Sequence, residues 1–386
     1  MDPMLTLMQI AALTTAGICF ALLGSVKLPL ARKLEIDEAK VGGLVSVFGF
    51  TLIPMVVAAG FLVDLLGQQA VLGGGFLLVI ISLVILAQSH NYITALMAVL
   101  VLGTGWSALV NVLNVTSPPA FVPPEELPQR MAYAMNMGDF IFGMGTFVTP
   151  LILVYCARHF GLVRTLYGFA LVAVVPLGLG LGVDWEALKT PATESIAGGL
   201  AKLLSDPIVW ICSIAFFFHL PTEASVAAWA TTLMTDKGVS EARSASLLSI
   251  FWLTFMGSRL VTALALPAGA DTTLVVVMAA GCIVVTLGIA SCRGATLMSI
   301  LIIAAGAIVG PIFPTLIAIL LGHVEPSLHG RAVGIFFCIG GIGWTILPIL
   351  IGAYAKRTSV QRGFLIANGS ALLLFCLSLV LAFRLE

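Results

Sequence analysis

Apolar residues fill the chain in long runs that charged residues and Pro/Gly-rich breaks separate. The runs Leu72 to Ala87 and Ala371 to Phe383 are apolar throughout except for Ser82 and Ser378. A run of roughly 20 apolar residues can cross a bilayer as a helix, whereas the strands of a transmembrane barrel alternate apolar and polar residues. The pattern therefore predicts an all-α polytopic membrane protein.

The apolar runs predict twelve transmembrane helices. Twelve spans with short connections need about 240 to 300 residues, and the chain has 386. The predicted helices lie near residues 5–31, 41–63, 70–88, 91–117, 130–156, 162–183, 207–235, 243–266, 273–291, 296–321, 331–355 and 362–384.

The longest polar stretch divides these helices six and six. We therefore expect an N-terminal six-helix half over residues 1–183, a cytoplasmic linker over 184–206 and a C-terminal six-helix half over 207–386. The segment Asp37 to Lys40 recurs as Ser240 to Arg243 at an offset of 203, and Gly145 to Pro150 recurs near Gly343 at an offset of 198. Chance similarity between apolar helices is the alternative. Two repeats in the same orientation imply a pseudo-two-fold axis along the membrane normal.

The composition excludes a soluble domain. Hydrophobic residues make up 60% of the chain and charged residues 9%, against roughly 25% charged residues in soluble domains. Eighteen basic residues balance eighteen acidic ones, so neither a nucleic-acid partner nor a polybasic lipid-binding patch is expected. The seven cysteines lie in or beside apolar segments without a CxxC motif, so we expect no disulfide and no metal site.

Two motifs carry a family resemblance. The segment after the second predicted helix resembles the major facilitator loop signature G-x-x-x-D-[RK]-x-G-[RK]-[RK] at Gly60, Asp64 and Gly67, with Leu65, Gln68 and Gln69 at its basic positions. The segment Phe217 to Trp229 resembles the pattern F-x-Y-V-G-x-E-x-S-x-x-x-W of the fucose, galactose and glucose:proton symporter branch, with His219 for Tyr and Pro221 for Gly. The chain is thus identified as a member of the major facilitator superfamily, similar to this branch.

The resemblance implies an alternating-access carrier that is not an enzyme and that has a site between its halves. The chain departs from the branch at two acids. Ser25 occupies the place of the first-helix Asp, and Val110 or Asn111 that of the fourth-helix Glu. The usual proton-carrying acids are therefore absent, and sugar:proton symport does not carry over directly.

Five costly polar residues lie inside predicted helices, namely Lys27, Asp139, His219, Glu223 and Arg259. A charge near the bilayer midplane costs at least ~2.5 to 3.5 kcal/mol, so such groups face a cavity or pair with one another. A helix rises about 1.5 Å per residue. On this scale Asp139 and Arg259, in helices five and eight, lie at a similar depth in the inner half of the membrane. Lys27 and Glu223, in helices one and seven, both lie in the outer half.

The resemblance implies that helices one and seven, and helices five and eight, meet between the halves. We therefore predict two gate pairs, Lys27 with Glu223 and Asp139 with Arg259. As alternatives, both basic side chains snorkel to the headgroups and Glu223 caps a kink at Pro221 in its helix. His219 could share the proton of Glu223, or it could be a neutral histidine with no role.

Neutral polar residues suit a small polar solute. Asn111 and Asn136 offer hydrogen bonds, and Trp106, Trp229 and Trp344 could stack on a sugar face, although each could instead serve helix packing. We expect a secondary active transporter of a sugar or sugar-like solute, driven by a proton or sodium gradient without a cofactor.

In that transporter Glu223 or Asp139 is the titrating group. The alternative is an organic-anion carrier in which Lys27 and Arg259 hold a carboxylate. A membrane scaffold or sensor is a third possibility, but it could dispense with the costly polar residues.

We expect a monomer in the plasma (inner) membrane whose partners are the solute, the coupling ion and the lipid bilayer. Both termini are expected to be cytoplasmic. For this orientation, five basic residues in the inner loops against eleven in the outer loops violate the positive-inside rule.

Overall fold

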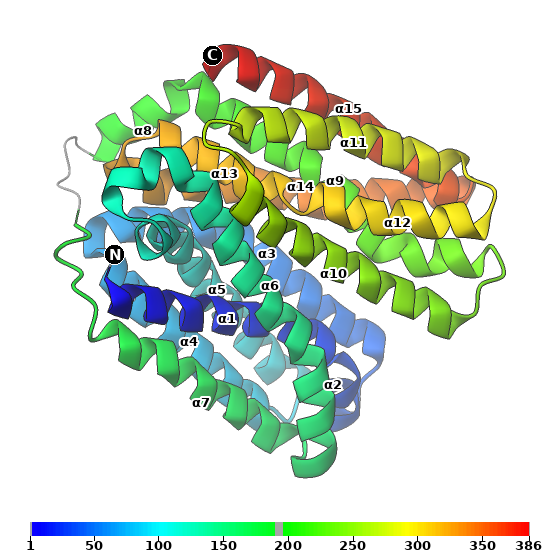
Figure 1. Cartoon of the computed structure of the whole chain (residues 1–386). Coiled ribbons are helices and arrows are strands. Elements are labelled where there is room, and N and C mark those ends of the chain that lie inside the picture. The colour runs from blue at the N-terminus through cyan, green and yellow to red at the C-terminus, as the bar shows by residue number, and fades with distance from the viewer. Residues whose placement is uncertain (1, 190–195, 386) are drawn as a thin grey trace. The chain divides into compact units, whose positions relative to one another are not determined.

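The structure is a computed structural model that describes residues 2–189 and 196–385 (Figure 1). Over these residues it has fifteen α-helices, two short 3-10 helices and no strand. Twelve helical segments in the described part are long and apolar enough to cross a membrane. The predicted class, an all-α polytopic fold with twelve spans, is therefore confirmed.

The chain forms two compact units. Unit 1 comprises Met1–Leu127, Ile141–Leu200 and Glu325–Cys338, and unit 2 comprises Pro128–Phe140, Ala201–Val324 and Ile339–Glu386. Unit 1 holds α1 (Pro3–Ser25), α2 (Lys27–Leu34), α3 (Glu38–Leu66), α4 (Gln68–Gln88), α5 (Tyr92–Phe121), η1 (Pro124–Glu126), α7 (Leu162–Gly180) and η2 (Pro326–Leu328).

Unit 2 holds α9 (Pro207–Thr235), α10 (Glu241–Ala265), α11 (Asp271–Ser291), α12 (Ala295–Val309), α13 (Ile312–His323) and α15 (Val360–Leu385). Three helices contribute residues to both units, namely α6 (Leu127–Phe160), α8 (Ile196–Ser205) and α14 (His329–Arg357). Of the expected linker, residues 190–195 lie outside the described residues, and α8 follows them.

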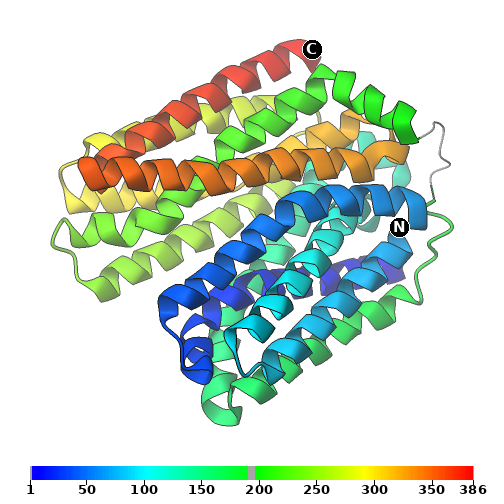
Figure 2. The ribbon, with the colours of Figure 1, turned by 180° about the vertical axis from the view of Figure 1, so that it is seen from behind.

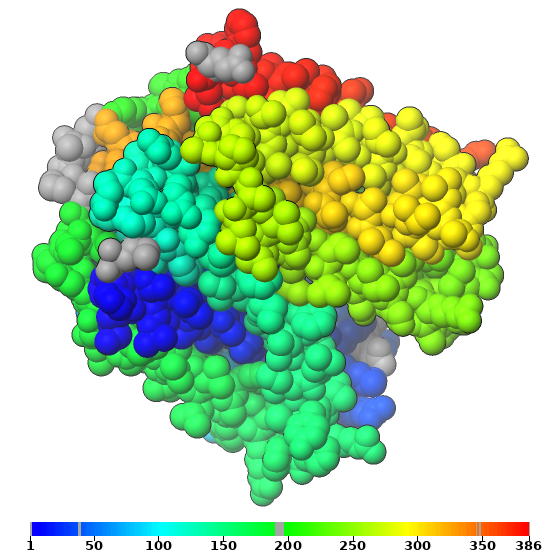
Figure 3. Space-filling view, in the orientation of Figure 1, coloured from blue at the N-terminus to red at the C-terminus, as the bar shows by residue number. Residues whose placement is uncertain are grey.

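Each unit has its own packed interior. In unit 1, α5 packs along α3 and α4 around buried side chains such as Phe76, Leu83 and Leu102. In unit 2, α15 runs beside α9 and α11 in both ribbon views (Figures 1 and 2). The side chains of α11 and α12 meet on one face of this unit (Figure 3).

Close helix contacts recur at the offset seen in the sequence. A methyl group in place of the Gly103 hydrogen would lie 2.9 Å from Cβ of Thr51, which ties α5 closely to α3. A methyl group on Gly306 would lie 2.3 Å from Oγ1 of Thr254, which ties α12 to α10 in the same way, 203 residues later. Glycine at both positions permits a helix approach that any side chain would block.

A lysine contact at a helix end also occurs in both units. Nζ of Lys33 donates to the carbonyls of Leu86 and Ala87, at 3.2 and 2.6 Å, in the last turn of α4. Nζ of Lys237 donates to the carbonyls of Cys292 and Arg293, at 2.9 and 3.3 Å, just after α11. A lysine at a helix C-terminus satisfies free carbonyls and complements the helix dipole, so each unit closes its corresponding helix by the same means.

The first predicted helix, 5–31, is divided. The helix α1 ends at Ser25, and α2 begins at Lys27 after Val26. Because Pro29 has no amide hydrogen, the carbonyl of Ser25 lacks its helical partner, which weakens the helix at this point. Lys27 therefore begins a second helix and does not lie within the first one.

Candidate functional site

A buried arginine anchors the charged groups of unit 2. Arg259 of α10 is 6% exposed, and its Nε donates to the carbonyl of Gly310 at 2.9 Å. Its guanidinium lies 4.2 Å from the ring centroid of Phe255, a cation–π distance. The arginine thus ends inside the unit, and the snorkelling alternative is wrong for this residue.

The partner carbonyl of Arg259 is available for a local reason. In a continuous helix, the carbonyl of Gly310 would accept from the amide four residues later, but that residue is Pro314, which has none. The tenth predicted helix, 296–321, is accordingly divided into α12 and α13 around Gly310 and Pro311. The Phe-Pro-Thr segment of α13 therefore creates the acceptor that holds Arg259.

Arg259 also pairs with an acid of α6. Its Nη1 lies 3.5 Å from Oδ2 of Asp139, as the sequence predicts for this pair. One turn earlier on α6, Nδ2 of Asn136 donates to Oγ1 of Thr315 at 3.2 Å. Among the described residues, Oδ2 of Asp139 and Oδ1 of Asn136 are buried without a hydrogen-bond donor. Two acceptors are therefore available to a proton or a ligand.

A second acid comes from α9. Oε2 of Glu223 lies 3.6 Å from Nε2 of His219, one turn away on the same face. His219 is fully buried, and neither ring nitrogen has a hydrogen-bond partner among the described residues. Thr222 Oγ1 and Trp229 Nε1 are also without partners there. A satisfied core histidine would have a bond to at least one nitrogen, so His219 does not fit that alternative.

The two acids act on each other through space. Glu223 lies close enough to Asp139 for coulombic repulsion, and Arg259 offsets it by attraction. With His219 neutral, two carboxylates and one guanidinium leave one negative charge in excess. No hydrogen bond joins Glu223 to the α9 backbone in the described part of the chain, so the alternative of a cap at Pro221 has no contact to support it.

The loop signature binds the start of α14 within unit 1. Nε of Arg331, which is 6% exposed, donates to Oδ2 of Asp64 at the end of α3. A methyl group on Gly60 would lie 2.4 Å from the carbonyl oxygen of Gly330. Gly67 precedes α4 with a φ of +84°, a conformation that favours glycine. Each matched position of the signature therefore has a structural reason.

Asn111 belongs to the same contact. Its Nδ2 donates to the carbonyl of Gly330 at 2.9 Å, while its Oδ1 is buried without a partner among the described residues. Arg331 is the residue that sequence reasoning missed. The predicted eleventh helix began at residue 331, so Arg331 lay at its boundary and was counted with the loop residues. In the structure α14 begins at His329, and Arg331 lies inside the helix. An acid in the signature without basic neighbours was the available signal that its partner lies elsewhere.

Two further predicted residues, Lys27 and Trp106, lie in unit 1. Lys27 is half-buried at the first position of α2, and no ion pair to it is present among the described residues. Its predicted partner Glu223 belongs to unit 2, so that pair stays a prediction. Trp106 is 6% exposed, stacks on Phe20 at 5.3 Å and donates to the carbonyl of Ala16 at 3.0 Å. Trp106 is therefore a packing residue.

Comparison with known proteins identifies the family. Residues 8–293 match the model of the Major Facilitator Superfamily, which is most of the chain. The protein belongs to the major facilitator superfamily of membrane transporters, as the sequence motifs predict. Its relatives differ in the solutes that their names report.

Two curated proteins are similar in sequence. The Gentisate transporter of Corynebacterium glutamicum is 25% identical over 394 residues, which cover 94% of this chain and 83% of that protein. Bypass of stop codon protein 6 of Saccharomyces cerevisiae is 21% identical over 174 residues, which cover 42% of this chain and 35% of that protein. The match to the yeast protein thus spans about a third of its length.

Solved structures share the fold. The fucose:proton symporter FucP of E. coli, in its outward conformation, superposes with a TM-score of 0.80 at 15% identity and covers 97% of each chain. The human organic anion transporter MFSD10 gives a TM-score of 0.80 at 15% identity and covers 97% of this chain and 99% of its own. The similarity to FucP agrees, at the level of the fold, with the branch that the motifs indicate.

Proposed function

We propose that this transporter couples the movement of a small polar solute to a proton, with Glu223 and Asp139 sharing the coupling role. The observation that carries this proposal is the charge balance in unit 2, where Asp139 lies 3.5 Å from the buried guanidinium of Arg259 and Glu223 lies close enough to repel it. An uncompensated charge inside a membrane span costs several kcal/mol. A proton on one of the acids removes the excess negative charge.

The same geometry supports a coupling cycle. Arg259 keeps its bond to the carbonyl of Gly310, so protonation of Asp139 frees α6 from the ion pair without leaving the arginine unpartnered. Breaking the pair with the acid still charged would cost about 3 to 5 kcal/mol. The proton therefore lowers the cost of separating α6 from α10, which is a step that alternating access requires.

The solute is a sugar or a similarly hydroxylated compound. Oδ1 of Asn136, Oγ1 of Thr222 and the indole N–H of Trp229 are polar groups without partners among the described residues. Hydroxyl groups both donate and accept hydrogen bonds, so a neutral polyol satisfies acceptors and donors of this kind together. The fold shared with a fucose:proton symporter supports this choice.

An organic anion is the second candidate. The relative that spans most of this chain is named as a transporter of gentisate, and a structure of equal TM-score is an organic anion transporter. Arg259 is engaged with Asp139 and Gly310. Lys27, half-buried and without an ion pair among the described residues, is the basic group that would hold the carboxylate.

A single reconstitution experiment tests both candidates. The purified protein is reconstituted into proteoliposomes made from plasma (inner) membrane lipids. Uptake of labelled sugars and of gentisate is then measured with and without an imposed pH gradient. We expect gradient-driven uptake of a sugar. Uptake of gentisate alone would favour the second candidate, and uptake indifferent to the gradient would contradict proton coupling.

We further propose a monomer with both termini on the cytoplasmic side. The binding of Asp64 to Arg331 and the helix α8 belong to this side in the proposed orientation. Labelling of a single cysteine placed at either terminus, in sealed cells, reports the side directly.

A further inference from the structure

One end of unit 2 is strongly basic. Three loops meet there, namely residues 236–240 between α9 and α10, 292–294 between α11 and α12, and 358–359 between α14 and α15 (Figures 1 and 2). These loops and the helix turns beside them carry six basic residues against two acidic ones, Asp236 and Glu241. The basic residues are Lys237, Arg243, Arg293, Lys356, Arg357 and Arg362. We call this region the basic end of unit 2.

Lys237 fastens the three loops to one another. Its Nζ donates to the carbonyls of Cys292 and Arg293, at 2.9 and 3.3 Å, and lies 3.4 Å from Oε1 of Gln361 as a further acceptor. Nε2 of Gln361 donates in turn to the carbonyl of Cys292 at 2.5 Å. The basic residues of three separate loops therefore gather at one end of unit 2.

The other five basic side chains of this end are exposed. None of them makes a hydrogen bond or an ion pair with the part of the chain that the structure describes. Arg243 and Arg362 lie in the first turns of α10 and α15, where the helix dipole disfavours a cation. Helix capping therefore does not explain these two arginines.

The basic end lies at headgroup depth. Each of its six basic residues is within two residues of the end of a membrane span. Tyr354, 39% exposed, lies one turn before the end of α14. Tyrosine at a span end is typical of the membrane–water interface. Lipid phosphates lie in the same layer.

We propose that the basic end of unit 2 binds the headgroups of anionic phospholipids in the leaflet that it meets. Phosphate oxygens accept charge-assisted hydrogen bonds from arginine and lysine, and basic residues beside a membrane span attract anionic lipid. The five exposed side chains need not meet on one molecule, because a leaflet presents a whole layer of headgroups. The expectation of no polybasic lipid-binding patch rested on the balanced charge of the whole chain, which does not show how the charges are distributed in space.

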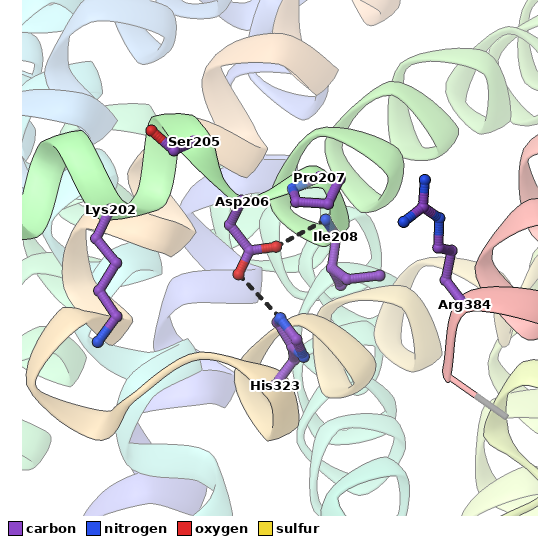
Figure 4. A pocket seen from close by; sticks show the side chains of 7 residues that line it. All are labelled: Lys202, Ser205, Asp206, Pro207, Ile208, His323 and Arg384. Atoms are coloured by element: carbon purple, nitrogen blue, oxygen red, sulfur yellow. Dashed lines mark hydrogen bonds and ion pairs between the residues drawn. The ribbon is translucent and has the colours of Figure 1, made fainter.

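The other end of α9 provides a control site (Figure 4). There Oδ1 of Asp206 accepts the amide hydrogen of Ile208 at 2.8 Å, and Oδ2 lies 2.9 Å from Nε2 of His323. Arg384 lines the same pocket. Because basic and acidic side chains occur together at that end, Arg384→Gln tests the loss of a basic residue from the same unit outside the basic end.

The test uses the full chain, purified in detergent and stripped of lipid. Phosphatidylglycerol, zwitterionic phosphatidylcholine or soluble glycerol phosphate is added, and native mass spectra and the thermal unfolding midpoint are recorded. We expect phosphatidylglycerol to bind more tightly than phosphatidylcholine and to raise the midpoint more than glycerol phosphate does. In Arg243→Gln/Arg362→Gln its affinity should fall about 30-fold, since each basic group is worth about fivefold.

Two controls accompany this variant. Arg243→Lys/Arg362→Lys keeps both charges and is expected to bind phosphatidylglycerol within about threefold of the parent, and Arg384→Gln within about twofold. If Arg243→Gln/Arg362→Gln fails to fold, Arg293→Gln in the loop should lose about fivefold by itself. Equal losses in the glutamine and lysine variants, or equal affinity of the parent for the two lipids, would overturn the proposed surface. Stabilisation by glycerol phosphate as strong as that by the lipid would overturn the lipid as its partner.

Discussion

Arg259 donates its Nε hydrogen to the carbonyl of Gly310 at 2.9 Å and holds Asp139 with its other end at 3.5 Å. The first contact exists because Pro314 leaves the carbonyl without a helical partner. The second contact joins α10 to a different helix, α6. Arg259 therefore keeps its contact with Gly310 when its ion pair with Asp139 breaks. Substitutions of Arg259 and of Asp139 should consequently have different effects.

Loss of Arg259 should be more damaging than loss of both charges. Arg259→Met leaves Asp139 as an uncompensated buried charge, so we expect the free energy of unfolding to fall by about 3 to 5 kcal/mol. Asp139→Asn/Arg259→Met should regain part of that loss. Thermal unfolding of the purified variants, in a double-mutant cycle with Asp139→Asn, measures the coupling. Simple additivity of the two single effects would contradict a direct ion pair.

Glu223→Gln should separate coupling from movement. The amide keeps the shape of the side chain but cannot carry a proton, so gradient-driven accumulation is expected to disappear while solute exchange continues. Counterflow and pH-driven uptake in proteoliposomes measure the two activities. Glu241→Gln, on the exposed first turn of α10, is the matched control and should accumulate like the parent. Undiminished uphill uptake in Glu223→Gln would transfer the coupling role to Asp139.

Lys27→Ala should distinguish the two solute classes. If a carboxylate is carried, we expect the variant to lose its binding by tenfold or more, because a charged hydrogen bond contributes about 1.5 to 3 kcal/mol. If a sugar is carried, binding should change by less than that. Isothermal titration with gentisate and with sugars checks this, with the exposed Lys40→Ala as a control. Gentisate binding that survives in Lys27→Ala would exclude Lys27 as its anchor.

Gly60→Ala should weaken the contact between α3 and α14. The added methyl would lie 2.4 Å from the carbonyl of Gly330, and such overpacking costs about 1 to 3 kcal/mol. Gly74→Ala on α4, where the methyl meets no atom within 4 Å, is the control. It should leave the unfolding midpoint unchanged or raise it slightly, since alanine is the better helix former. Equal midpoints for the two variants would show that the close approach is not required.

The sequence predicts much of the charged cluster because each charge inside an apolar helix is conspicuous. Asp139 and Arg259 were matched by sign, by depth and by the helix layout that the family resemblance implies, and the structure places them together. Arg331 was not predicted because the start of its helix was placed two residues too late, so that it was counted with the loop residues. The acceptor of Arg259 also escaped, since the effect of Pro314 on a carbonyl four residues earlier appears only once the helix path is known.

The charged cluster of unit 2 has apolar counterparts in unit 1. At the repeat offsets of 203 and 198, the counterparts of Glu223, Arg259 and Asp139 are Phe20, Val56 and Phe337, all of them apolar and all in unit 1. Phe20 stacks there on Trp106. A proton that enters the cluster would thus alter the charge of unit 2 and leave that of unit 1 unchanged.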